Sequence, residues 1–111
     1  MQLFIVVLTE GEYVTTMLKK FSDHNFHGSV LSTKSIRHAL MDSIEPEPYF
    51  GGLHHVVEDM EEVQRPMIFV VVKNDEDIKQ LSHLANEAVG GIKGKGFLYS
   101  LPINYLEGLD D

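Results

Sequence analysis

The sequence predicts an α+β fold in which an antiparallel sheet carries two helices on one face. A buried strand, an amphipathic helix and a second strand follow one another in the first half of the chain, and the same plan returns in the second half. Thr9 and Asn74, the expected helix caps, stand 65 residues apart, and so do the starts of their helices. A strand–helix–strand unit that occurs twice predicts a ferredoxin-like sandwich with a double βαβ arrangement.

The first strand is expected at Leu3–Leu8, a short and almost wholly apolar run rich in β-branched residues. Thr9, with Glu12 three positions later, has the pattern of a capping box, which predicts a helix from about Glu10 to Asp23. The apolar residues of this helix fall at helical spacing: Tyr13, Val14, Met17, Leu18 and Phe21.

Asn25 is expected to end the first helix, and Phe26–Thr33 to form the second strand. Residues 34–66 then separate this strand from the third, which is too long for an ordinary connection. The run SIRHALMDSI has apolar residues at helical spacing and is expected to form a short helix, ended by the prolines that follow. Tyr49 and Phe50 form an expected contact tip, either packed on the body of the protein or presented to a partner protein.

The second half begins with a buried strand at Met67–Val72. Asn74 caps the next helix, whose first turn is acidic and therefore suits the positive end of the helix dipole. Gly90 is expected to end the helix, and Phe97–Leu101 to form the last strand. The apolar stripe of the helix consists of Ile78, Leu81, Leu84, Ala85 and Ala88.

Length and composition predict one domain, residues 1–111, with an ordinary hydrophobic fraction of 43%. A formal charge of −8 repels phosphate backbones, so no nucleic-acid partner is expected. Cysteine is absent, and the apolar start is too short to span a bilayer, so we expect a cytoplasmic protein without a membrane span.

The two central strands are apolar at both alternating sets of positions. Helices on one face of the sheet therefore leave a second apolar face that must also be covered. The chain has no further element for this purpose, so we expect other copies of the protein to cover that face.

The order and spacing of these elements resemble the PII-like signalling superfamily. The closing stretch GKGFLYSLPI matches the pattern of that superfamily at Gly94, Gly96, Tyr99 and Pro102-Ile103. The resemblance implies a homotrimer, a long T-loop between the second and third strands, here about residues 34–66, and a short B-loop before the fourth strand. The second strand is also similar to that of the cyclic-di-AMP receptor branch, at Asn25, Phe26, Gly28, Ser29, Leu31, Ser32 and Thr33.

The chain departs from both patterns. Phe97 occupies the place of the PII lysine that binds nucleotide phosphate, and the Arg-x-Arg after the last PII strand is missing. Ser35-Ile36-Arg37 stands where the cyclic-di-AMP branch has Gly-Gly-Phe. Neither ligand site is therefore intact, and the resemblance implies the fold more firmly than the ligand.

The loop GGIKGKG is the main candidate for ligand binding. Its glycines permit a positive φ, so that successive backbone N–H groups can converge on an anion, and Lys93 and Lys95 supply positive charge. The alternative is a helix C-cap followed by a tight turn, with both lysines exposed. The resemblance implies that this loop meets the second strand of a neighbouring subunit. The candidate ligand-binding residues are Ser29, Ser32, Thr33, Lys34, Arg37, Gly91, Lys93, Gly94, Lys95 and Gly96.

No metal site is predicted, although His54 and His55 each precede an acidic residue by four positions, because no third ligand is evident. The sequence has no Gly-x-Ser-x-Gly motif, no cysteine and no evident pair of catalytic carboxylates, so neither an enzymatic activity nor a cofactor is expected.

The leading interpretation is a non-enzymatic regulatory protein that binds a small anionic effector, an adenine nucleotide or a cyclic dinucleotide, in clefts between subunits. It would act on a partner protein through the 34–66 loop. One alternative is a trimeric metal-binding protein of the CutA kind. Another is an interaction subunit that binds no small molecule.

Overall fold

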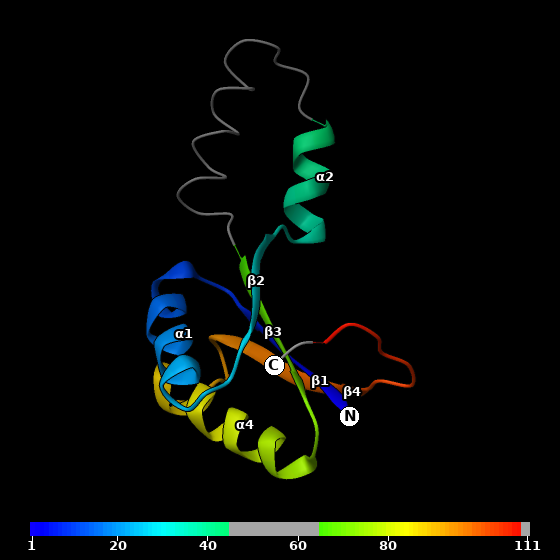
Figure 1. Ribbon diagram of the computed structural model, residues 1–111. Helices are drawn as coiled ribbons and strands as arrows, with labels where there is room; N and C mark the ends of the chain where they lie inside the picture. The colour runs from blue at the N-terminus through cyan, green and yellow to red at the C-terminus, as the bar shows by residue number, and fades with distance from the viewer. Residues whose placement is uncertain (45–64, 110–111) are drawn as a thin grey trace.

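The computed structural model describes residues 1–44 and 65–109, and these form a ferredoxin-like α+β sandwich (Figure 1). The four strands make one antiparallel sheet in the order β2-β3-β1-β4, so the two central strands are β1 and β3. The predicted fold class is confirmed. The elements are β1 (Gln2–Leu8), the 3₁₀ turn η1 (Gly11–Tyr13), α1 (Val14–Asp23), β2 (Gly28–Thr33), α2 (Ile36–Ile44), β3 (Arg65–Val72), α4 (Asp75–Val89) and β4 (Gly96–Pro102).

The hydrophobic core lies between the sheet and the helices α1 and α4, which cover the same face (Figure 1). Alternate residues of β1 and β3 point into it, and α1 contributes Met17 and Phe21. The rings of Phe4 and Phe21 meet edge to face, with their centroids 6.2 Å apart. The remaining core residues are Val6, Leu8, Ile68, Val70, Val72, Leu81, Leu84, Ala85 and Val89.

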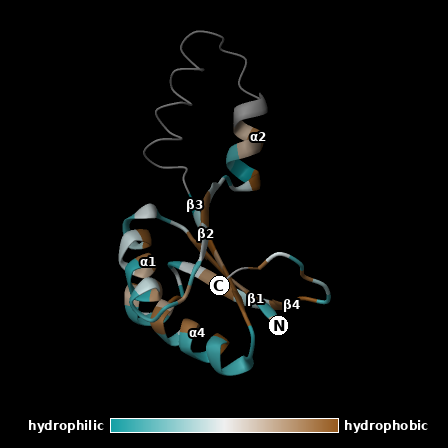
Figure 2. Cartoon of the chain, viewed as in Figure 1, coloured by the Kyte–Doolittle hydropathy of each residue, from teal (hydrophilic) through white to brown (hydrophobic). Residues whose placement is uncertain are grey.

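The other face of the sheet, here called the open face, is also apolar. The strand registers place on it Leu3, Ile5 and Val7 of β1, Ser29, Leu31 and Thr33 of β2, Arg65, Met67, Phe69 and Val71 of β3, and Phe97, Tyr99 and Leu101 of β4. The three β4 side chains are 40–49% exposed, and the rings of Phe97 and Tyr99 stack with centroids 6.0 Å apart. The sheet strands are partly brown in Figure 2, where residues of both faces colour the same ribbon. A face of this composition is typical of an interaction surface.

The predicted capping box at Thr9 is wrong. The backbone N–H and the hydroxyl of Thr9 both donate to the carbonyl of Lys95, at 3.0 and 3.1 Å. The chain then forms η1, and α1 begins at Val14 rather than near Glu10. The hydroxyl that could have capped the helix is used in a tertiary contact with the segment before β4, 86 residues away. The hydrogen bonds from Thr9 to the segment before β4 thus prevail over the local preference of this threonine for a helix N-cap.

The other predicted helix signals are confirmed. The Asn74 side chain caps α4 by accepting a hydrogen bond from the N–H of Asp77 at 2.9 Å. Gly90 ends α4 with a φ of 72°. The break at Asn25 has a left-handed φ of 64°. The short helix expected after β2 is α2.

The second strand begins at Gly28 instead of Phe26. The ring of Phe26 packs against the core, whereas Gly28 passes so close to β3 that a Cβ there would lie 2.1 Å from the carbonyl oxygen of Phe69. The close approach to β3 requires a residue without a Cβ, so β2 begins to pair with β3 at Gly28. At the other strands the observed bounds differ from the expected ones by one or two residues.

Tyr49, Phe50, His54 and His55 lie outside the described residues. Within the described ranges, no helix is long and apolar enough to span a membrane.

Candidate functional site

Apart from Ser29, near the start of β2, the candidate ligand-binding residues fall into two groups at the same end of the sheet. One group lies where β2 leaves the sheet, and the other is the loop that enters β4. Because β2 and β4 are the two edges, β3 and β1 lie between the groups. Three strand spacings separate the edges by roughly 14 Å. One chain therefore does not bring the two groups into contact.

The β2 group is divided between the two faces of its strand. Ser29 and Thr33 lie on the open face, opposite Phe69 and Arg65, whereas Ser32 is opposite Pro66 on the helix-facing side. The Thr33 hydroxyl donates to the carbonyl of Arg65 at 2.9 Å, so it ties β2 to the first residue of β3. Of these hydroxyls, those of Ser29 and Thr33 can face a ligand that lies on the open face.

Positive charge gathers where the chain leaves β2. Lys34 follows the strand, Arg37 lies in the first turn of α2, and Arg65 begins β3. Ser35 caps α2 by accepting a hydrogen bond from the N–H of His38 at 3.2 Å. A cation in the first turn of a helix opposes the helix dipole, which costs about 0.3–1 kcal/mol, and the acidic first turn of α4 has the opposite, favourable arrangement. The position of Arg37 is thus not explained by helix stability.

The glycine loop has the backbone conformation of a helix cap and a tight turn. Gly91 donates its N–H to the Asn86 carbonyl, and Ile92 donates to the Asn86 side chain, at 2.8 and 2.9 Å. Lys95 then donates to the carbonyl of Ile92 at 3.0 Å, and Gly94 has a φ of 84°, as the third residue of a type II turn requires. The backbone of this loop is therefore a helix C-cap followed by a tight turn, as the alternative to an anion-binding loop predicts.

The ammonium group of Lys95 makes contacts with two other segments of the same chain. Its Nζ donates to the carbonyl of Val89 at the end of α4 and lies 5.4 Å from the ring centroid of Tyr13. Its carbonyl accepts both hydrogen bonds from Thr9. Lys95 thereby joins α4, η1 and the end of β1, whereas the side chain of Lys93 is exposed. Of the two loop lysines, Lys93 is the one that extends into solvent.

Replacing Lys95 with methionine tests this structural role. Lys95→Met keeps most of the side-chain volume but removes a charge-assisted hydrogen bond and a cation–π contact, so we expect the free energy of unfolding to fall by about 1–3 kcal/mol. Urea unfolding followed by circular dichroism measures the change. The control is Lys93→Met, with an expected change within about 0.5 kcal/mol. Equal effects of the two substitutions would show that Lys95 is not a structural tie.

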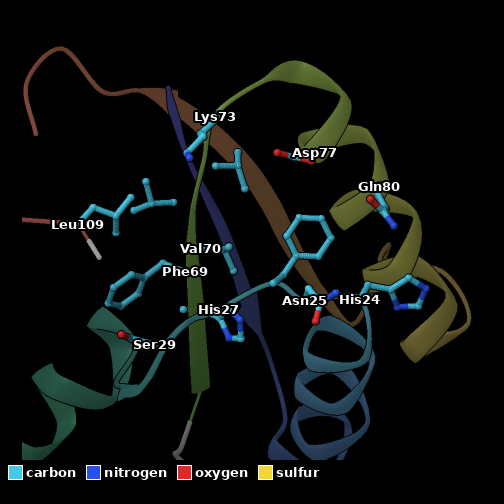
Figure 3. Close-up of a pocket in the computed structure, with 14 residues that line it drawn as sticks. His24, Asn25, His27, Ser29, Phe69, Val70, Lys73, Asp77, Gln80 and Leu109 are labelled. Carbon is cyan, nitrogen blue, oxygen red and sulfur yellow. The ribbon is translucent and has the colours of Figure 1, made fainter. Parts of the chain in front are cut away.

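A recess that was not predicted lies at the opposite end of the sheet. It has a volume of about 760 Å³ and forms because β3 continues past the start of β2 at Gly28 (Figure 3). Figure 3 shows Asp77 and Gln80 of α4, His27 and Leu109 around it. Of the candidate ligand-binding residues it includes only Ser29. No motif marks it in the sequence, because it results from unequal strand lengths.

The described residues do not form a metal centre. No group of three or more His, Cys, Asp or Glu side chains among them could hold a metal ion. A hydrogen bond to Glu12 raises the pKa of Tyr13, and one to Glu107 raises the pKa of Tyr105. Both phenols are therefore protonated at neutral pH and are poor bases there.

The fold and this arrangement define the class: a ferredoxin-like α+β protein with a second apolar sheet face that no described helix covers, and with polar groups at one end of the sheet. No protein-family model matches the sequence, and no curated protein matches it. Among solved structures, it is similar to a functionally unknown protein from Pediococcus pentosaceus ATCC 25745. The TM-score is 0.61, the match covers 97% of this chain and 96% of that chain, and the sequences are 13% identical. This similarity shows the fold alone.

Proposed function

We propose that the protein is a non-enzymatic regulatory protein of the PII-like kind. Three copies assemble through their open faces, and a small anionic effector, an adenine nucleotide or a cyclic dinucleotide, binds in the clefts between them. Effector binding shifts the population of conformations that the segment 34–66 presents to a partner protein. The observation that carries the proposal is the open face, which exposes Leu31, Phe97, Tyr99 and Leu101 in the single chain.

The topology supports the placement of the effector between subunits. The β2 group and the glycine loop lie at one end of the sheet but on opposite edges. When copies pack with their open faces toward a common axis, the β2 edge of one copy can approach the β4 edge of the next. The hydroxyl of Thr33 and the exposed side chain of Lys93 would then face each other across a subunit boundary.

Two features limit how an effector could bind in this cleft. The Phe97 and Tyr99 rings stack on the open face at the start of β4, so a flat ring can stack there in turn. The Lys95 ammonium is already bonded to the end of α4, so Lys93 is the better candidate for a contact with phosphate. The effector site would therefore differ from one in which a lysine of the last strand binds phosphate.

Calorimetry with a panel of nucleotides tests the proposal. We expect a saturable heat on titration of ATP, ADP, AMP or cyclic-di-AMP into untagged protein, with a stoichiometry of one ligand per chain. The assembly is measured beforehand by native mass spectrometry, where three times the 12.5 kDa chain mass is expected. A trimer that gives no heat with any of the four at tens of micromolar would refute nucleotide binding. A single-chain mass would refute the assembly.

A further inference from the structure

Arg65 has an unusual position on the open face. It is the first residue of β3, opposite Thr33 of β2, and the strand alternation places it in the same row as Met67 and Phe69. Among the residues of the four described strands, it is the one charged residue on this face. It lies at the margin of the face, at the end where the 34–66 segment leaves and rejoins the sheet.

A guanidinium at this margin needs an anionic partner once the face is covered. In the single chain Arg65 is half-buried, and its charge can still reach water. If sister copies cover the face, part of that water is removed, and a desolvated charge is costly unless it is paired. Arg65 makes no ion pair with any described residue. The chain as described thus supplies no partner for it.

The described residues around the start of β3 favour a bound anion. The Thr33 hydroxyl lies next to its backbone, and Arg37 is in the first turn of the neighbouring α2. Arg37 also makes no ion pair with any described residue. An arginine on the open face and another in the first turn of α2, both without an ion-pair partner among the described residues, give this part of the molecule positive charge that attracts an anion.

We infer that Arg65 binds a phosphate group of the effector at the margin of the open face, opposite Thr33 of β2. Arginine suits this role because its planar fork donates two parallel hydrogen bonds to phosphate oxygens. The inference rests on the proposed function and adds to it a binding residue at the end of the 34–66 segment, where the chain enters β3. A different partner, a carboxylate of a sister copy, would make Arg65 a subunit contact instead.

The experiment compares wild-type protein with Arg65→Gln and with Lys79→Gln as control. Lys79 is an exposed lysine of α4, so its loss changes the net charge equally but far from the root of the 34–66 segment. We expect Arg65→Gln to weaken the binding of the active nucleotide by at least about tenfold in calorimetry, with the native mass unchanged, and Lys79→Gln to change it by less than about twofold.

A second measurement keeps the inference testable if no nucleotide binds. Sodium pyrophosphate is titrated at constant ionic strength while the arginine Nε–H signals are followed by NMR. Saturable shifts at Arg65 support the anion site even when the nucleotide panel fails, and their absence with pyrophosphate and nucleotides alike overturns it. Unchanged affinity in Arg65→Gln, or loss of the assembly with no change in affinity per site, also overturns it.

Discussion

Leu101→Asp is expected to convert the proposed trimer into single chains. Leu101 lies on the open face of the edge strand β4, opposite Leu3, and is 47% exposed in the single chain. Its exposure means that a carboxylate there can remain solvated in the isolated protein. In an assembly, the same carboxylate would be desolvated against apolar residues, a cost of several kcal/mol for each copy. Native mass spectrometry and light scattering would show a mass equal to one chain.

The matched control is Ile36→Asp, which introduces the same charge on α2 at a side chain that is 80% exposed and lies outside the sheet. This variant is expected to keep the wild-type mass. If Leu101→Asp also keeps a trimeric mass, the copies meet through another surface. Far-ultraviolet circular dichroism of both variants confirms that any change in mass is not a loss of fold.

Gly96→Ala is expected to lower the free energy of unfolding by on the order of 3 kcal/mol or more. The φ of Gly96 is 155°, and a Cβ there would lie 2.2 Å from the carbonyl oxygen of Val7 and 3.0 Å from the Cα of Leu8. These atoms belong to the backbone of the central strand β1, so they cannot move aside without distorting the sheet. Urea unfolding measures the loss as a lower midpoint with an unchanged slope.

Gly94→Ala measures the cost of a positive φ alone, without the steric clash that is expected at Gly96. Gly94 also has a positive φ, 84°, but a Cβ there would meet nothing within 4 Å. Its substitution is expected to cost about 1–2 kcal/mol, the penalty for a left-handed alanine. An equal loss in the two variants would show that the close approach to Val7 is unimportant. A Gly96 variant that fails to bind an effector would not identify a ligand contact, because its fold is expected to be impaired.

Local sequence signals were sufficient for much of the glycine loop but not for its side chains. The glycine pattern predicted positive φ angles, and these are present at Gly90, Gly91, Gly94 and Gly96. The same pattern allowed both an anion-binding loop and a helix cap with a turn. The cap is what the backbone adopts, because Asn86 accepts hydrogen bonds from three of the loop N–H groups, those of Gly90, Gly91 and Ile92. That the Lys95 ammonium contacts Val89 and Tyr13 depends on how η1 packs near α4, which no local pattern encodes.

The positions of the strands and helices, and the side of each that is apolar, could be predicted from the amino-acid sequence. Strand and helix periodicity, the Asn74 cap and the glycine that ends α4 depend on residues close in the chain, so they could be identified before any tertiary contact was known. The apolar open face also followed from the alternation in β1 and β3, since both sets of positions in these strands are apolar.

Which residues distant in sequence lie close to one another became clear only from the tertiary structure. The strand order puts the two candidate groups on opposite edges at one end of the sheet and leaves Arg65 at the margin of the open face. In the same fold the Thr9 hydroxyl donates to the carbonyl of Lys95 instead of capping α1. These outcomes come from pairing between segments distant in sequence, where the gain from a shared ladder exceeds the small energy of a local cap. Periodicity encodes which side of an element is apolar, but only packing decides what that side meets.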